Sequence, residues 1–179
     1  WLADRFLGHR NATRWGGLLI LAGHLCLALP VRETFFLGLA LVVAGTGLLK
    51  PCVSTLVGGL YAADDPRRDS GYSLYYMGIN LGAFLAPLAC GWLALSNTSQ
   101  RFLESLGFAP TTAWHLGFGA AAAGMLLGLV QFVRGQRHLA GVGDPPFERN
   151  TRDVRRLRAG IFVLGSAGVL LATLVGLGH

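Results

Sequence analysis

TFFLGLALVVAGTGLLKPCVSTLVGGL, residues 34–60, is apolar and long enough to cross a membrane as one helix. Lys50 is the only charged residue in this stretch. A lysine near the centre of a bilayer costs about 2.5 to 3.5 kcal/mol, so it usually faces a polar cavity or a partner. Lys50 lies about ten residues from the end of the span, roughly 15 Å at helical rise, which is too deep for easy snorkelling to the interface. Lys50 is therefore a candidate functional residue.

The rest of the chain has the composition of a membrane protein. Of its 179 residues, 53% are hydrophobic and only 13% are charged, whereas soluble domains carry about 25% charged residues. The sequence contains no strong alternation of the β-barrel type, so it predicts an all-α membrane protein in the lipid bilayer. The expected apolar segments are residues 15–29, 34–60, 72–95, 113–133 and 159–177.

The arginines predict how the chain is oriented. They lie before the first apolar segment, between the second and third, and after the fourth, so these three regions fall on one side of the membrane. The positive-inside rule places that side in the cytoplasm, which predicts a multi-pass protein of the cell inner membrane. The net charge of +6 is explained by these loops, and no nucleic-acid partner is expected. The chain begins without Met, so we expect a piece of a longer protein.

Pro51 follows Lys50 directly and predicts a bend in the second segment. A proline removes one helical hydrogen bond and crowds the carbonyl group four residues earlier, that of Gly47. Gly45 also lies in this turn. Irregular backbone at membrane depth is tolerated where it lines a cavity, so a bend beside a charge is typical of a transport pathway.

The third segment carries a row of polar and aromatic side chains. Tyr72, Tyr76 and Asn80 recur every four residues and so share one helix face, which Phe84 continues. Such a face would hydrogen-bond either a polar ligand or a neighbouring helix. The residue types alone favour neither alternative.

Other polar or small residues in the segments have structural explanations. His24 and His115 would suit a proton relay, but without a nearby carboxylate a packed or interfacial histidine is the better explanation. Gly78 and Gly82 form a G-x-x-x-G pattern, which predicts close helix packing. The three cysteines, Cys26, Cys52 and Cys90, show no metal-binding spacing and are interpreted as small buried residues. No catalytic or metal-binding set is present in the sequence, so neither an enzyme nor a cofactor is expected.

Five sequence patterns together resemble a known family. LADRFLGHR at the start of the chain, with Asp4, Arg5, Gly8 and Arg10, resembles the loop between helices two and three of major facilitator superfamily transporters. GTGLLKP (residues 45–51) and YSLYYMGINLGAF (residues 72–84) resemble the fourth and fifth helices of the proton-dependent oligopeptide transporters. RRDSGY (residues 67–72) resembles the lead-in to that fifth helix, and WHLGFG (residues 114–119) the start of the sixth. Thr13 departs mildly from the first motif.

The resemblance implies a partial helix bundle and a transport function. Residues 1–135 would be helices three to six with the cytoplasmic 2–3 loop, 136–158 a basic cytoplasmic linker, and 159–179 an extra helix between the two halves or the start of helix seven. The function implied is proton-coupled uptake of di- and tripeptides by alternating access, with the proton as the coupling ion. The helices that carry the rest of the site would be partners from the same transporter.

Site roles also follow from the resemblance. Lys50 matches the family lysine tied to peptide carboxylate binding and proton coupling, Asn80 matches the asparagine that contacts the peptide, and Tyr76 is a cavity-lining candidate. We also expect Asp4 and Arg5 to form charge pairs with Arg67 and Arg68 on the same side of the membrane, which would hold the cytoplasmic side closed in one state. The residues expected to take part in gating are Asp4, Arg5, Gly8, Arg10, Arg67, Arg68 and Pro51.

Two alternatives remain open. One is a major facilitator carrier of another substrate, such as a drug, nitrate or an amino acid, because function depends on sites and half of this site is missing. The other is a truncated, non-transporting membrane protein.

Overall fold

A computed structural model describes residues 3–109, 112–139 and 141–144 of the chain. The described residues are helical and contain no strand, as the sequence predicted. The last predicted segment, residues 159–179, and most of the linker before it lie outside the described residues. The elements in order are the π-helix η1 (Ala3–Leu7), α1 (His9–Ala28), α2 (Arg32–Gly59), α3 (Arg68–Leu95), α4 (Asn97–Ser105), α5 (Trp114–Gly135) and the 3₁₀ turn η3 (Gln136–His138).

Three of these helical stretches are long and apolar enough to cross a membrane: α2, α3 and Trp114–His138. The predicted first span corresponds to α1, which begins at His9 rather than at Trp15. Its first two turns therefore carry charged and polar residues, including Arg10 and Arg14. Proline does not interrupt α2, which remains one helix through Pro51.

Glycines hold α1 and α2 close together over most of their length. A Cβ atom on Gly16 of α1 would lie 2.8 Å from the carbonyl oxygen of Gly45 of α2, and one on Gly45 would lie 2.5 Å from that of Gly16. Gly23 and Gly38 make the same reciprocal contact, at 2.7 Å each. The two pairs lie about two helical turns apart. Small residues of this kind let backbones approach closely, which drives helix association where lipid replaces water.

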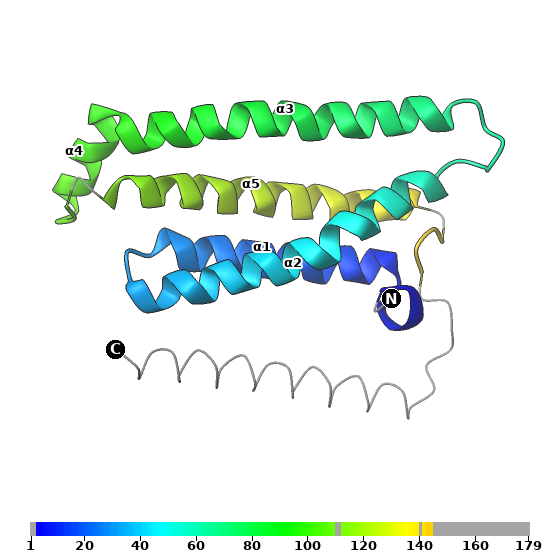
Figure 1. Ribbon diagram of the computed structural model, residues 1–179, viewed down its shortest axis with the longest axis horizontal. Coiled ribbons are helices and arrows are strands. Elements are labelled where there is room, and N and C mark those ends of the chain that lie inside the picture. Colours follow the sequence, from blue (N-terminus) through cyan, green and yellow to red (C-terminus); the bar gives the residue numbers. More distant parts are fainter. Residues whose placement is uncertain (1–2, 110–111, 140, 145–179) are drawn as a thin grey trace.

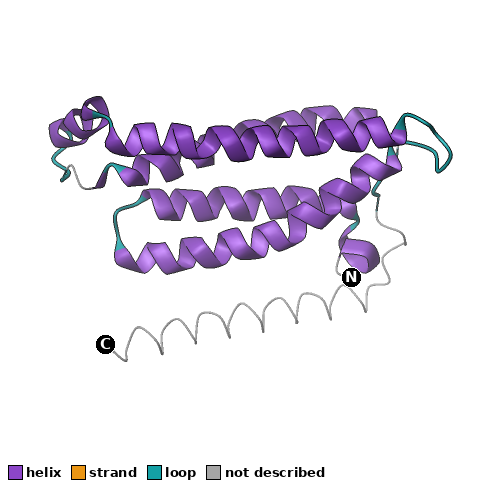
Figure 2. Ribbon diagram, turned by 45° about the horizontal axis from the view of Figure 1, so that its top comes forward, coloured by secondary structure: helices purple, strands orange, loops and turns teal. Residues whose placement is uncertain are grey.

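The four long helices pack side by side in the order α2, α1, α5, α3 (Figure 1). α5 lies between α1 and α3, and its Leu129 fills the space left by Gly17 of α1. α3 meets α5 where Cys90 packs against Gly117, with 3.3 Å between the cysteine Cβ and a Cβ built on the glycine. Figure 2 shows α3 at the edge of the layer, away from the α1–α2 pair over most of its length. No residue of α3 is buried within the described chain.

α4 was not predicted, because it lies between the expected apolar segments 72–95 and 113–133. The Ser96 side chain accepts a hydrogen bond from the backbone N–H of Ser99 at 3.1 Å, which is the standard way to cap the first turn of a helix. Ser99 and Leu103 are buried, so this short helix packs on the end of the bundle.

The described parts of the three arginine-rich regions lie at the same end of the bundle. The start of the chain, the α2–α3 loop and the segment after α5 meet there, whereas the α1–α2 turn and α4 lie at the opposite end (Figure 1). This arrangement is the one that the alternation of basic loops predicts for antiparallel spans.

Candidate functional site

Lys50 lies in a cavity of about 400 Å³ between α2 and α3. The cavity is lined by residues of one face of α2 and one face of α3, which are Thr46, Gly47, Lys50, Pro51, Ser54, Tyr75, Tyr76 and Ile79. A single cation among hydroxyl groups and apolar walls is suited to bind the anionic end of a small polar ligand.

The position of Lys50 follows from how α2 divides its faces. Gly45 and Cys52 are buried on the side that packs against α1 and the start of the chain. Gly47 lies on the other side, and a Cβ built on it would have no neighbouring atom within 4 Å. Lys50 lies on this open side, and the described helices leave it exposed.

Two hydroxyl groups of α2 bind back to the helix in the turn after Lys50. Ser54 and Thr55 both donate to the carbonyl oxygen of Pro51, at 2.9 and 3.0 Å. Such side-chain bonds back to the helix are common at helix bends. Because Pro51 has no N–H to donate to the Gly47 carbonyl, the predicted gap in the hydrogen-bond ladder lies inside a continuous helix, next to the cavity.

On α3, the structure brings Tyr76 to Lys50 but does not place Asn80 among the cavity residues. Tyr75 and Tyr76 both line the cavity, with ring centroids 5.4 Å apart. Asn80 is exposed. Sequence reasoning missed Tyr75, Thr46 and Ser54. The missed signal on α3 is the combined three- and four-residue spacing of Tyr72, Tyr75, Tyr76 and Ile79, which marks the helix face that turns towards α2.

A second cavity, of about 390 Å³, opens next to the first at the arginine-rich end. Its lining residues are Ser54, Thr55, Gly58, Gly59, Arg68 and Tyr72. The Tyr72 hydroxyl donates to the carbonyl oxygen of Ser54 at 3.3 Å and joins α3 to α2. Ser54 lines both cavities, so Arg68 lines the cavity next to that of Lys50.

Two of the residues expected to take part in gating contact residues close to them in the sequence. Asp4 contacts His9 at 3.4 Å, and Arg67 contacts Asp65 at 2.9 Å within the α2–α3 loop. The hydrogen bonds from Arg67 hold the pKa of the Asp65 carboxyl below its usual value. Arg5 is exposed on η1 at the same end.

Gly8 joins η1 to α1 with φ of 72°, a left-handed conformation that favours glycine. Its backbone N–H donates to the carbonyl oxygen of Ala3 at 2.8 Å, which closes the turn before α1. Gly8 therefore sets the direction in which η1 leaves the bundle.

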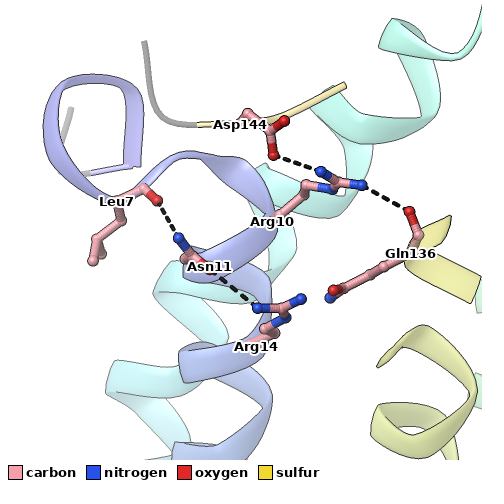
Figure 3. Close-up of polar contacts among 6 residues, drawn as sticks. All are labelled: Leu7, Arg10, Asn11, Arg14, Gln136 and Asp144. Carbon is pink, nitrogen blue, oxygen red and sulfur yellow. Dashed lines mark hydrogen bonds and ion pairs between the residues drawn. The ribbon is translucent and has the colours of Figure 1, made fainter. Parts of the chain in front are cut away.

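Arg10 makes contacts across the chain. Its guanidinium donates to the Asp144 carboxylate at 2.5 Å and to the carbonyl oxygen of Gln136 at 2.7 Å (Figure 3). The start of α1 is thereby bound to the end of α5.

The histidines differ in their surroundings. His115 Nδ1 lies 2.7 Å from the carbonyl oxygen of Leu27, and its ring packs on Trp114 with centroids 4.4 Å apart. His115 thus joins α5 to the end of α1, in agreement with a packed histidine. Nδ1 of His24 is buried and has no hydrogen-bond partner among the described residues. In the described part of the chain, no group of three or more His, Cys, Asp or Glu residues could hold a metal ion.

Comparison with known proteins identifies similar chains. The model of the POT family, PTR2, matches residues 10–145. A transporter of Bacillus subtilis (strain 168) is 50% identical over 133 residues, which are 74% of this chain and 24% of the relative. A di-/tripeptide transporter of Lactobacillus helveticus is 48% identical over 136 residues, 75% of this chain and 26% of the relative.

A solved structure has the same fold. The crystal structure of a peptide transporter, POT, in complex with sulfate matches 99% of this chain with a TM-score of 0.76 and 44% sequence identity. The match covers 34% of that structure. The chain therefore spans about a quarter of the curated relatives it matches and about a third of that structure.

Proposed function

Since this chain belongs to the POT family of transporters, we propose that it forms part of a carrier that takes up di- and tripeptides together with protons by alternating access. Relatives named as di-/tripeptide transporters support the substrate class. In this proposal α1, α2, α3 and α5 are helices three to six of the carrier, residues 136–158 are a cytoplasmic linker, and the carrier lies in the cell inner membrane. The other helices of the same transporter complete the site.

The observation that carries the proposal is the Lys50 cavity. A peptide presents a carboxylate at one end, and Lys50 supplies a cation among the hydroxyl groups of Ser54, Tyr75 and Tyr76. The open side of α2 around Gly47 leaves room for the rest of the peptide. Asn80 lies further along α3, where it would meet a backbone group of the substrate rather than its carboxylate.

Proton coupling is assigned to Lys50 as part of the same proposal. A lysine ammonium can release its proton when a neighbouring charge changes, which links substrate binding to protonation. One charge that moves down a membrane potential of 100 mV supplies about 2.3 kcal/mol. The proton is the coupling ion, and no other cofactor is proposed.

The test uses the full-length transporter in proteoliposomes with an imposed proton gradient. Lys50→Ala should abolish proton-driven uptake of a labelled dipeptide, whereas Arg101→Ala, which removes a cation on α4 outside the cavity, should keep it. An unlabelled dipeptide should compete for uptake and a free amino acid should not. Normal uptake by the Lys50→Ala variant would remove this lysine from the mechanism.

A further inference from the structure

The segment Gly141–Asp144 folds back onto the arginine-rich end of the bundle. The N–H of Arg10 donates to the carbonyl oxygen of Gly143 at 3.1 Å, which joins this segment to the first turn of α1. The chain is turned there by Gly141 and Gly143, whose φ angles are 85° and 80°. Both lie in the left-handed region, which glycine adopts without strain.

Arg10 fixes this segment through its side chain as well. The guanidinium bridges the carboxylate of Asp144 and the backbone carbonyl of Gln136 (Figure 3). The Arg10 side chain is 19% exposed and that of Asp144 is 55% exposed, so water reaches this ion pair mainly from the carboxylate side. Hydrogen bonds of a charged group are roughly twice as strong as neutral ones, and a planar guanidinium can make both bonds at once.

The same segment packs against the last turns of α2. A Cβ built on Gly59 would lie 2.6 Å from Cγ1 of Val142, so the valine occupies the place of a side chain there. Gly143 lies against Leu56 in the same way, and Leu56 is only 4% exposed. These turns follow Pro51, where the proline weakens the helix.

We propose that Gly141–Asp144 is a latch that fastens residues 52–59 of α2 to the first turn of α1 and the end of α5, with the Arg10–Asp144 ion pair as its closure. The latch controls residues 52–59 of α2, which follow Pro51. Ser54, which lines the Lys50 cavity, lies in this part of the helix. Arg10 then acts between helices of this part of the molecule. Any effect of the latch on peptide uptake rests on the proposed function, whereas the contacts that form the latch do not.

The latch is tested by hydrogen–deuterium exchange in the full-length transporter. Asp144→Asn should speed exchange at the first turn of α1 and at residues 56–59 by roughly tenfold, because the ion pair no longer holds them. Asp144→Glu keeps a carboxylate and should restore slow exchange. Asp64→Asn removes an equal charge from the α2–α3 loop and should leave exchange as in the parent protein.

Two glycine variants provide a second test that leaves the charges intact. Gly143→Ala and Gly141→Ala introduce the same backbone strain, but only the Cβ on Gly143 would meet Leu56 and Arg10. Exchange should therefore be faster in Gly143→Ala than in Gly141→Ala.

Equal exchange in Asp144→Asn and Asp64→Asn would overturn the latch, whatever the transporter carries. If the parent transporter takes up no dipeptide but the variants show the expected exchange pattern, the proposed function is overturned and the latch is supported.

Discussion

Gly16 and Gly45 face each other across α1 and α2 so closely that neither can carry a side chain. A Cβ on either glycine would lie within 2.8 Å of the other's carbonyl oxygen. Gly45 lies on the buried side of the turn that leads to Lys50, and Gly47 lies on its open side. One short glycine pattern therefore serves both helix packing and the cavity.

This division predicts different outcomes at neighbouring glycines. Gly45→Ala should destabilise the full-length transporter by about 1 to 3 kcal/mol, because the added methyl group forces α1 and α2 apart. Gly47→Ala, in open space, should not lower the thermal unfolding midpoint, and an alanine favours the helix. Thermal unfolding in detergent measures both. A similar loss of stability in both variants would contradict the close contact.

Tyr75 is predicted to take part in substrate binding. Tyr75→Phe removes one hydroxyl group from the Lys50 cavity and should raise the KM for a dipeptide about two- to tenfold, the range expected for one hydrogen bond. Tyr61→Phe, which changes a tyrosine outside the cavity, is the matched control and should leave the KM unchanged. The measurement is the concentration dependence of uptake. An unaltered KM in Tyr75→Phe would exclude its hydroxyl from the site.

Ser96 is predicted to hold the start of α4. Ser96→Ala removes the side-chain acceptor for the Ser99 N–H and should destabilise this helix by about 1 kcal/mol. Hydrogen exchange of residues 97–105 should then become faster. Thr98→Ala, a change at an exposed position of the same turn, should have little effect. Unchanged exchange in Ser96→Ala would mean that packing alone maintains α4.

The α2–α3 loop should respond to acid through Asp65. Its folded-state pKa is lowered by hydrogen bonds from Arg67, so the pair stabilises the loop above the ordinary pKa of Asp and loses this effect as pH falls through the lowered value. Arg67→Gln should raise the pKa of Asp65 towards its usual value, and Arg68→Gln should not. Carboxyl-carbon NMR with labelled aspartate measures the titration. An equal pKa in both variants would show that Arg67 is not the cause.

Much of the fold could be predicted from sequence because it depends on local signals. Apolar length marked α2, α3 and α5, and basic loops marked their common end. α4 was missed because its signal was short: a serine cap before a polar turn with one buried leucine. Residues 97–105 lack the long apolar run that identifies a span, so their helix depends on the cap and on packing.

The candidate site was predicted in part. Lys50 could be predicted because a charged residue within a membrane span is energetically costly, and Tyr76 could be predicted from its helical spacing. Gly78 and Gly82 were predicted to pack closely, but a Cβ on either has no neighbour within 4 Å among the described residues. The contact face of α3 depends on which helices surround it, and a four-residue spacing alone cannot identify that face. The placement of Asn80 in substrate binding stays a prediction for the same reason.

The reciprocal glycine contacts have a consequence for biosynthesis. α1 and α2 are consecutive in the chain and joined by a short turn, so they can pair as soon as both have emerged from the ribosome and entered the bilayer. α3 has no buried residue in the described part of the chain, so its packing gains little from this early pairing. A substitution in the α1–α2 contact should therefore be sensed early by quality-control proteases, whereas one on the outer face of α3 should matter only after synthesis is complete.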